Sequence, residues 1–258
     1  MKFLSSVFRT GHSAGRNRRA RLELRSTEMA IYAVGDVHGC LDQLLSLERK
    51  ILADAAEIPG PKLIIMLGDY IDRGPASAQV IDHLAAEPPE GFDRICLAGN
   101  HEVMMLDYLE RRESRARWLS LGADATLASY GIDHRRLREL YRNGEGIDEM
   151  IRETVPAAHA AFLRSLPVLV SAPGFLFVHA GIRPGVELAD QKDEDLVSIR
   201  SEFYAKAHLI DRLVVHGHTP VERPMLEGKR LNIDTGAYFS GRLTAVRFWQ
   251  CQARILMT

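Results

Sequence analysis

Short apolar runs recur along the chain and predict the strands of a β-sheet. They cover residues 30–34, 63–67, 94–98, 175–178, 213–215, 231–233 and 243–249. Each run is nearly continuous in aliphatic or aromatic residues, which is typical of strands that are covered on both faces. We therefore expect an α/β protein in which helices flank the sheets.

Helical patterns with clear ends separate the early strands. Leucines repeat at helical spacing from Leu41 to Ile51, before the Pro-Gly-Pro at 59–61, and a second helix is expected from Pro75 to Pro88. This alternation of strand and helix predicts parallel pairing with right-handed crossovers. A long helical stretch over 103–166 follows. The later strands are joined by short turns, so we expect them to pair antiparallel and the sheet system to be mixed.

Charge is distributed unevenly along the 258 residues, of which 46% are apolar and sufficient for a large core. The formal net charge is −1, but residues 1–25 carry +6, which leaves −7 for the rest. A mildly acidic body lacks the cationic field of a nucleic-acid reader, so no specific nucleic-acid partner is expected. Residues 1–27 have no apolar periodicity and predict a disordered basic tail, followed by a single domain over 28–258. Two alternatives for the tail remain open: contact with an anionic partner, or a natural start at Met29.

The cysteines and the apolar runs bear on location. Cys40, Cys96 and Cys251 are widely spaced and form no C-x-x-C pair, so neither a disulfide framework nor a thiolate zinc site is indicated. No uninterrupted apolar run reaches the ~18 residues of a membrane span, and the first residues lack the apolar core of a secretory signal. We expect a cytoplasmic protein with reduced thiols.

Polar residues beside glycine terminate five of the predicted strands. The segments are Gly-Asp-Val-His-Gly at 35–39, Gly-Asp-Tyr-Ile-Asp-Arg-Gly at 68–74, Gly-Asn-His-Glu at 99–102, His-Ala-Gly at 179–181 and His-Gly-His-Thr at 216–219. Side chains at the carboxyl ends of α/β strands meet in one crevice. Carboxylate, imidazole and amide groups suit manganese, iron or zinc. Six such ligands are too many for one tetrahedral ion and fit two ions that share a carboxylate, an arrangement suited to displacement at phosphorus.

These motifs resemble those of the phosphoprotein phosphatase family within the calcineurin-like metallophosphoesterases. Gly-His-Thr-Pro at 217–220 and Ile-Asp-Thr-Gly-Ala at 233–237 are similar to the lambda-type bacterial serine/threonine protein phosphatases in particular. The resemblance extends from Ile31 to about Phe248. It implies the calcineurin-like fold, with mixed β-sheets sandwiched by α-helices and a helical insert between the third and fourth motifs.

The resemblance also implies a metal centre with two divalent ions, with Mn²⁺ expected and Fe or Zn as alternatives. The ligands it assigns are Asp36 and His38 for the first ion, Asp69 as the bridge, and Asn100, His179 and His218 for the second ion. A water shared by two such ions has a lowered pKa and supplies a bridging hydroxide as the nucleophile of direct in-line hydrolysis.

Substrate-binding and proton-transfer roles follow from the same resemblance. Arg73 and Arg200 are expected to bind phosphate oxygens, together with Asn100. His101 is expected to protonate the leaving group as general acid, and Asp72 to orient it. The family often places an aromatic residue shortly before the second arginine, and this chain has none directly before Arg200.

Plainer interpretations compete with these roles. Asp and Asn beside glycine are ordinary turn formers, although their joint occurrence argues against that reading. Asp72 and Arg73 could form a structural ion pair, and His101 could support a metal ligand without transferring a proton. His216 lies two residues before a proposed ligand, and we interpret it as a supporting or structural residue.

The leading hypothesis is a metallophosphoesterase, specifically a serine/threonine protein phosphatase with phosphotyrosine as a further substrate. Its partner would be a phosphoprotein or phosphopeptide, and we expect a monomer. The alternative is hydrolysis of a diadenosine polyphosphate or another nucleotide, as in the related symmetrical diadenosine tetraphosphatase branch. The segments 72–74 and 100–102 favour the phosphatase branch. A regulator that has lost catalysis is a third hypothesis, against which the intact ligand set argues.

Overall fold

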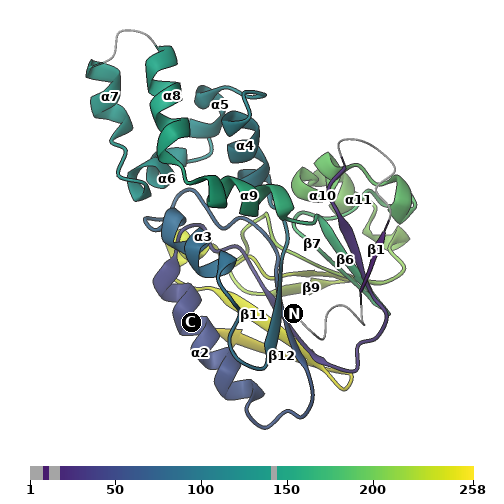
Figure 1. Cartoon of the computed structure of the whole chain (residues 1–258). Helices are drawn as coiled ribbons and strands as arrows, with labels where there is room; N and C mark the ends of the chain where they lie inside the picture. The colour runs from purple at the N-terminus through teal and green to yellow at the C-terminus, as the bar shows by residue number, and fades with distance from the viewer. Residues whose placement is uncertain (1–7, 12–17, 141–143) are drawn as a thin grey trace.

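Two mixed sheets pack against each other and carry helices on their outer faces (Figure 1). The structure is a computed structural model that describes residues 8–11, 18–140 and 144–258. Buried apolar side chains from both sheets, among them Ile31 and Ile65 from one and Phe177 and Val215 from the other, form the core between them. The predicted α/β sandwich with mixed sheets is confirmed.

The five-stranded sheet contains the first three predicted strands. Its order is β12 (Gln252–Met257), β11 (Thr244–Trp249), β3 (Ala30–Val34), β4 (Lys62–Met66) and β5 (Phe92–Cys96). The pairs β3–β4 and β4–β5 are parallel, as predicted from the intervening helices α2 (Leu41–Ala55) and α3 (Ser77–Ala85). β11 closes the sheet by pairing antiparallel with β3 and β12.

The seven-stranded sheet corrects part of the topology prediction. Its order is β1 (Phe8–Gly11), β2 (Arg21–Leu24), β6 (Leu169–Ala172), β7 (Phe175–Val178), β8 (Leu213–His216), β10 (Arg230–Asn232) and β9 (Met225–Glu227). The antiparallel pairs β6–β7 and β9–β10 each contain a strand that was not predicted, β6 and β9. The predicted strands β7, β8 and β10 pair in parallel, against the prediction of antiparallel pairing. The crossover from β7 to β8 holds two helices that were not predicted, α10 (Asp193–Ser198) and α11 (Ser201–Ala205).

The prediction of a disordered tail through residue 27 is wrong for the part of that segment in which β2 lies. β2 pairs parallel with β6, and Leu24 is buried. The arginines that resembled a solvated tail are bound: the backbone N–H of Arg19 and the guanidinium of Arg21 each donate to the carboxylate of Asp193 at 2.7 Å. The domain therefore begins before residue 28. Residues 1–7 and 12–17 of the predicted tail lie outside the described residues.

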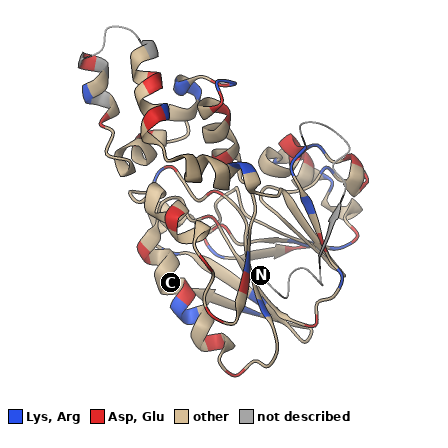
Figure 2. Ribbon diagram, viewed as in Figure 1, with Lys and Arg blue, Asp and Glu red and all other residues tan. Residues whose placement is uncertain are grey.

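Six helices form the insert that the sequence predicted over 103–166, and they lie together at one end of the sheets (Figure 1). They are α4 (Asn100–Leu109), α5 (Arg115–Leu119), α6 (Ala123–Ser129), α7 (His134–Leu140), α8 (Gly144–Thr154) and α9 (Ala157–Ser165). Acidic and basic residues are interspersed along these helices (Figure 2). Inside the insert, the buried ring of Trp118 lies 5.1 Å from that of Tyr108.

Short helical elements complete the described chain. They are two 3-10 turns, Leu188–Asp190 and Ala207–Leu209, and α12 (Ala237–Ser240), which follows the Ile-Asp-Thr-Gly motif. No helix in residues 8–11, 18–140 and 144–258 is long and apolar enough to cross a membrane.

Candidate metal centre

The side chains that the sequence singled out as metal ligands meet at the carboxyl ends of the strands. Asp36 and His38 follow β3, Asp69 follows β4, Asn100 begins α4 after β5, and His179 and His218 follow β7 and β8. All of them are buried except Asn100, which is partly exposed. The carboxyl ends of these strands therefore bring the candidate ligands close together, as expected from the strand order.

Asp69 lies between two groups of potential ligand atoms. Its Oδ2 is 3.6 Å from Nε2 of His38 and 3.3 Å from Nε2 of His179. The ligand atoms of His38, Asp69 and His101 all lie within 4.8 Å of one another, and so do those of Asp69, His179 and His218. Two groups that share one carboxylate have the arrangement that two neighbouring cations need.

Backbone carbonyls fix which nitrogen of two histidines faces the centre. Nδ1 of His38 donates to the carbonyl of Ile71 at 2.8 Å, and Nδ1 of His179 donates to the carbonyl of Leu67 at 3.1 Å. Because a carbonyl only accepts, the Nε2 of each neutral ring carries a lone pair. This support by backbone carbonyls is characteristic of histidines that bind a metal.

Acceptor atoms that face one another indicate a binding site for a cation. Nε2 of His179 lies 3.1 Å from Oδ1 of Asn100 and 3.3 Å from Oδ2 of Asp69. With the His179 ring neutral, these three atoms are all acceptors, and they repel one another unless a metal cation or a proton on Nε2 lies among them. Imidazole, carboxylate and amide donors suit manganese, iron or zinc. The residues present therefore fit a centre of two divalent ions.

The buried carboxylate of Asp36 is only partly compensated by the protein. Oδ1 of Asp36 has no hydrogen-bond partner among the described residues, while Oδ2 accepts the backbone N–H of His218 at 3.0 Å. Burial, reinforced by Asp234 and Asp69, raises the pKa of Asp36. Burial opposes ionisation of Asp69 as well, but the imidazoles of His179 and His101 hold its pKa well below the ordinary value. A divalent cation would relieve this concentration of negative charge.

Strained backbone is concentrated at this centre. Five site residues that are not glycine have positive φ: His38 at 46°, Asp69 at 53°, Asp72 at 67°, Arg73 at 70° and His218 at 69°. Such conformations cost about 1–3 kcal/mol each and persist only where the surroundings enforce them.

Glu102 is the residue that holds the central loop in place. Its buried carboxylate accepts the backbone N–H groups of Asp69 at 2.8 Å, Tyr70 at 2.7 Å and Gly99 at 2.9 Å. Burial and then the charge of Asp69 raise the pKa of Glu102 to about 7. Glu102 belongs to the Gly-Asn-His-Glu motif, but no role was predicted for it from the sequence.

His101 and Asp72 have the geometry of an oriented proton donor. Nδ1 of His101 donates to Oδ2 of Asp72 at 2.7 Å. Asp72 also accepts hydrogen bonds from Thr126 Oγ1 at 2.6 Å and from Trp118 Nε1 at 3.2 Å, so the helical insert fixes it. Burial would lower the pKa of His101, but Asp69 and Asp72 outweigh it and raise that pKa. Thr126 gave no sequence signal, because it lies far along the chain from Asp72.

Two arginines lie beside the centre, one at each of the two groups of ligand atoms. Nη1 of Arg73 is 2.9 Å from Nε2 of His38, and its Nη2 is 3.2 Å from Nε2 of His101. Nε of Arg200 donates to Nε2 of His218 at 3.0 Å, although no aromatic residue directly precedes it. The structure therefore brings both predicted phosphate-binding arginines to the candidate ligands.

His216 lies outside the two ligand groups. It is buried, its ring is 5.1 Å from that of Phe203, and its Nδ1 lies 3.1 Å from the carbonyl of Gly217. Among the described residues its Nε2 has no hydrogen-bond partner. This placement fits the structural interpretation made from the sequence.

A groove of about 600 Å³ begins at Asn100 and runs between α4, α5 and α10. Val103, Met104 and Leu121 supply apolar surface. The charged side chains that line it are Arg19, Arg112, Arg117, Asp107, Glu113, Asp193 and Glu194. The volume lies within the usual range of small-molecule sites.

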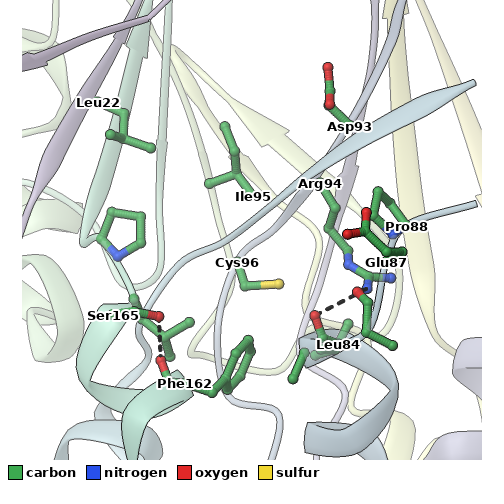
Figure 3. A pocket seen from close by; sticks show the side chains of 14 residues that line it. Leu22, Leu84, Glu87, Pro88, Asp93, Arg94, Ile95, Cys96, Phe162 and Ser165 are labelled. Atoms are coloured by element: carbon green, nitrogen blue, oxygen red, sulfur yellow. Dashed lines mark hydrogen bonds between the residues drawn. The ribbon is translucent and has the colours of Figure 1, made fainter. Parts of the chain in front are cut away.

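A second cavity, of about 430 Å³, lies between α3, β5 and α9 (Figure 3). Leu22, Ile95 and Phe162 line it, and none of the candidate metal ligands does. Nη2 of Arg94, which is labelled in this view, donates to the carbonyls of His83, Leu84 and Ala86 at the end of α3. These bonds give Arg94 a structural role.

The family follows from this fold and this centre. The model of the calcineurin-like phosphoesterase family matches residues 29–241, so the chain belongs to that family. The protein is therefore a metal-dependent phosphoesterase.

Curated proteins of similar sequence include asymmetrical bis(5′-nucleosyl)-tetraphosphatases. An asymmetrical bis(5′-nucleosyl)-tetraphosphatase, PrpE, of Halalkalibacterium halodurans is 28% identical over 236 residues, which cover 83% of this chain and 88% of the relative. The PrpE of Oceanobacillus iheyensis is 29% identical over 233 residues, with 85% and 89% covered.

Solved structures share the fold. A crystal structure provisionally assigned as a diadenosine tetraphosphatase has a TM-score of 0.63 at 19% identity, with 91% of this chain and 96% of that chain covered. A protein serine/threonine phosphatase of Saccharomyces cerevisiae has a TM-score of 0.54 at 19% identity, with 91% and 81% covered. A cold-active protein tyrosine phosphatase reaches 0.55 at 17% identity, with 97% and 88% covered.

Proposed function

We propose that the protein hydrolyses dinucleoside polyphosphates, with asymmetric cleavage of the phosphate chain. The similarity to the PrpE tetraphosphatases carries this proposal, because it extends over 83% of this chain and 88% of the relative. The alternative in the sequence analysis was the symmetrical branch, and the relatives point to the asymmetrical one. The proposal replaces the protein phosphatase as leading hypothesis.

The chain supplies groups for a polyphosphate on both sides of the centre. Arg73 lies at the ligand group that contains His38, and Arg200 lies at the group that contains His218. A planar guanidinium binds two phosphate oxygens at once and stabilises charge in the transition state. Two arginines in these places suit a chain of phosphates that passes across the centre.

The residues with proposed ligand roles are Asp36, His38, Asp69, Asn100, His179 and His218. Two divalent ions bound there would supply positive charge for the phosphoryl oxygens and would lower the pKa of the attacking water. The protein would hold these ligands in place and bind the phosphate through Arg73 and Arg200. These contacts would fix the direction from which the water attacks the phosphorus.

We assign His101 to the leaving group, with Asp72 holding its ring. The proton on Nε2 of His101 would pass to the departing oxygen, and Nδ1 would stay hydrogen-bonded to Asp72. A departing polyphosphate is a weak base and needs this proton little, whereas the alkoxide of a serine is a strong base and needs it more. The demand for His101 therefore depends on the substrate.

A substrate panel at fixed metal concentration tests the proposal. We expect the highest kcat/KM with diadenosine tetraphosphate, and chromatography should detect ATP and AMP in equal amounts. Two molecules of ADP would instead indicate symmetrical cleavage. A higher kcat/KM for phosphoserine, phosphothreonine or phosphotyrosine peptides would reinstate the protein phosphatase and overturn the proposal. No turnover even of para-nitrophenyl phosphate would support a regulator without catalysis.

A further inference from the structure

Two large aromatic side chains are exposed next to the metal centre. Tyr238 and Phe239 lie on the four-residue helix α12, directly after the Ile-Asp-Thr-Gly motif, and are 39% and 64% exposed. Single exposed apolar side chains are common, but adjoining exposed aromatic rings form an apolar surface of the kind found at sites of contact with another molecule. Neither residue has a role in the mechanism described above.

Tyr238 connects this pair to the catalytic groups. Its ring centroid is 5.3 Å from that of His38, at an interplanar angle of 80°. The guanidinium carbon of Arg73 lies 4.9 Å from the same centroid, which is within the range of a cation–π contact. The ring of Tyr238 therefore contacts both a candidate metal ligand and Arg73.

Phe239 presents its ring to solvent from a fixed position. Its ring centroid is 4.9 Å from that of Tyr238, and the rings are nearly perpendicular at 84°. Gly236 lies beneath the Phe239 ring, since a Cβ added to Gly236 would overlap the ring carbons. Gly236 also has φ of 64°, which a residue with a side chain adopts only with strain. The glycine thus lets one part of the ring pack on backbone while most of it stays exposed.

We propose that Phe239 is a stacking surface for a nucleobase of the substrate, and that Tyr238 holds Arg73 for the adjoining phosphate. This inference rests on the proposed nucleotide hydrolysis and assigns its base-binding residue. Every nucleobase has an apolar face that stacks on an aromatic side chain, so this contact would accept different bases. A phosphorylated peptide has no base and would not need it.

The test compares substrates that do and do not carry a base. Loss of one stacking contact costs about 1–3 kcal/mol, which corresponds to about a 5- to 150-fold change. We expect Phe239→Leu to raise KM and to lower kcat/KM for diadenosine tetraphosphate by a factor in this range. Turnover of glycerol phosphate, which carries no ring, should be unchanged. Phe239→Trp keeps an aromatic ring at this position and should retain the wild-type affinity for diadenosine tetraphosphate. Leu226→Ala is the matched control, because Leu226 is 65% exposed on β9 and is apolar.

Equilibrium binding gives a readout that does not depend on turnover. Calorimetry should show Phe239→Leu weakening the binding of AMP by a factor in the same range, with the binding of inorganic phosphate unchanged. Equal losses for AMP and phosphate, or no loss for either, would overturn the stacking role.

The outcomes separate the inference from the proposed function. If the wild-type protein cleaves diadenosine tetraphosphate and Phe239→Leu behaves like it, the stacking role is overturned and the function stands. If the wild-type protein does not cleave the dinucleotide, the proposed function fails, and this inference fails with it.

Discussion

The Nδ1 of His101 donates a 2.7 Å hydrogen bond to the carboxylate of Asp72, and this pair lies directly beside the candidate metal ligands. Nε2 of His101 is also 3.7 Å from Oδ2 of Asp69, close enough to be confused with a ligand. An experiment must therefore distinguish whether His101 donates a proton or binds a metal ion.

Substituting His101 should slow the reaction without removing the metals. General acid catalysis contributes about 10²- to 10⁴-fold, so we expect His101→Asn to reduce kcat by such a factor for phenyl phosphate, which has a basic leaving group. Turnover of para-nitrophenyl phosphate and of diadenosine tetraphosphate should fall less. Elemental analysis should find the wild-type metal content. Loss of metal from His101→Asn would make His101 a ligand instead.

Glu102 should support both stability and metal binding. Glu102→Gln keeps the size of the side chain but replaces one of the two oxygens that accept backbone N–H groups with a donor. Leaving a buried group unpaired costs about 1–3 kcal/mol, and we expect the free energy of unfolding, measured with urea, to fall by that amount. Supporting residues of metal sites typically alter affinity about 10- to 100-fold. A variant with unchanged stability and unchanged metal affinity would contradict this role.

Strand β2 should be part of the stable domain. Leu24 is buried between the sheets, so Leu24→Ala should reduce the free energy of unfolding by about 2–5 kcal/mol. Leu45→Ala is a suitable control, because Leu45 is exposed on α2 and its loss should change stability little. Similar urea midpoints for the two variants would show that β2 contributes nothing to folding.

The three cysteines should differ in reactivity towards iodoacetamide. Burial raises the pKa of Cys40 to about 11 and that of Cys96 to about 12, whereas Cys251 is exposed. Because the thiolate is the reactive form, raised pKa values leave little of it at pH 8. Mass spectrometry should detect one rapid modification per folded chain, at Cys251, and none in Cys251→Ser. Rapid labelling of Cys96 would contradict the burial described.

The candidate site could be predicted from the sequence because strand ends bring short motifs together. Asp36 and Asp69 follow an apolar run after a single glycine, and His179 follows one directly. Their convergence therefore followed from the topology of an α/β sheet. Thr126 could not be found in this way, since its contact with Asp72 depends on how the helical insert packs. Tyr238 and Phe239 carried no signal either, because exposure next to the centre is visible only in three dimensions.

The errors in the fold prediction have related causes. β2 is only four residues long, and the arginines in and around it concealed its buried leucine, Leu24. Only the packed structure shows that Asp193 binds the backbone of Arg19 and the side chain of Arg21. The parallel pairing of β7 with β8 was missed because α10 and α11 are too short to show a helical period.

The metal content of wild-type protein and of Asp69→Asn tests the central claim most directly. Asp69 lies between the two groups of ligand atoms, so its carboxylate should be shared by both ions. After loading with Mn²⁺ and removal of free metal, elemental analysis should find two ions per wild-type chain. Asp69→Asn should retain one ion or fewer and lose hydrolysis of every substrate. Two ions retained by Asp69→Asn, or a single ion in active wild-type protein, would contradict the account.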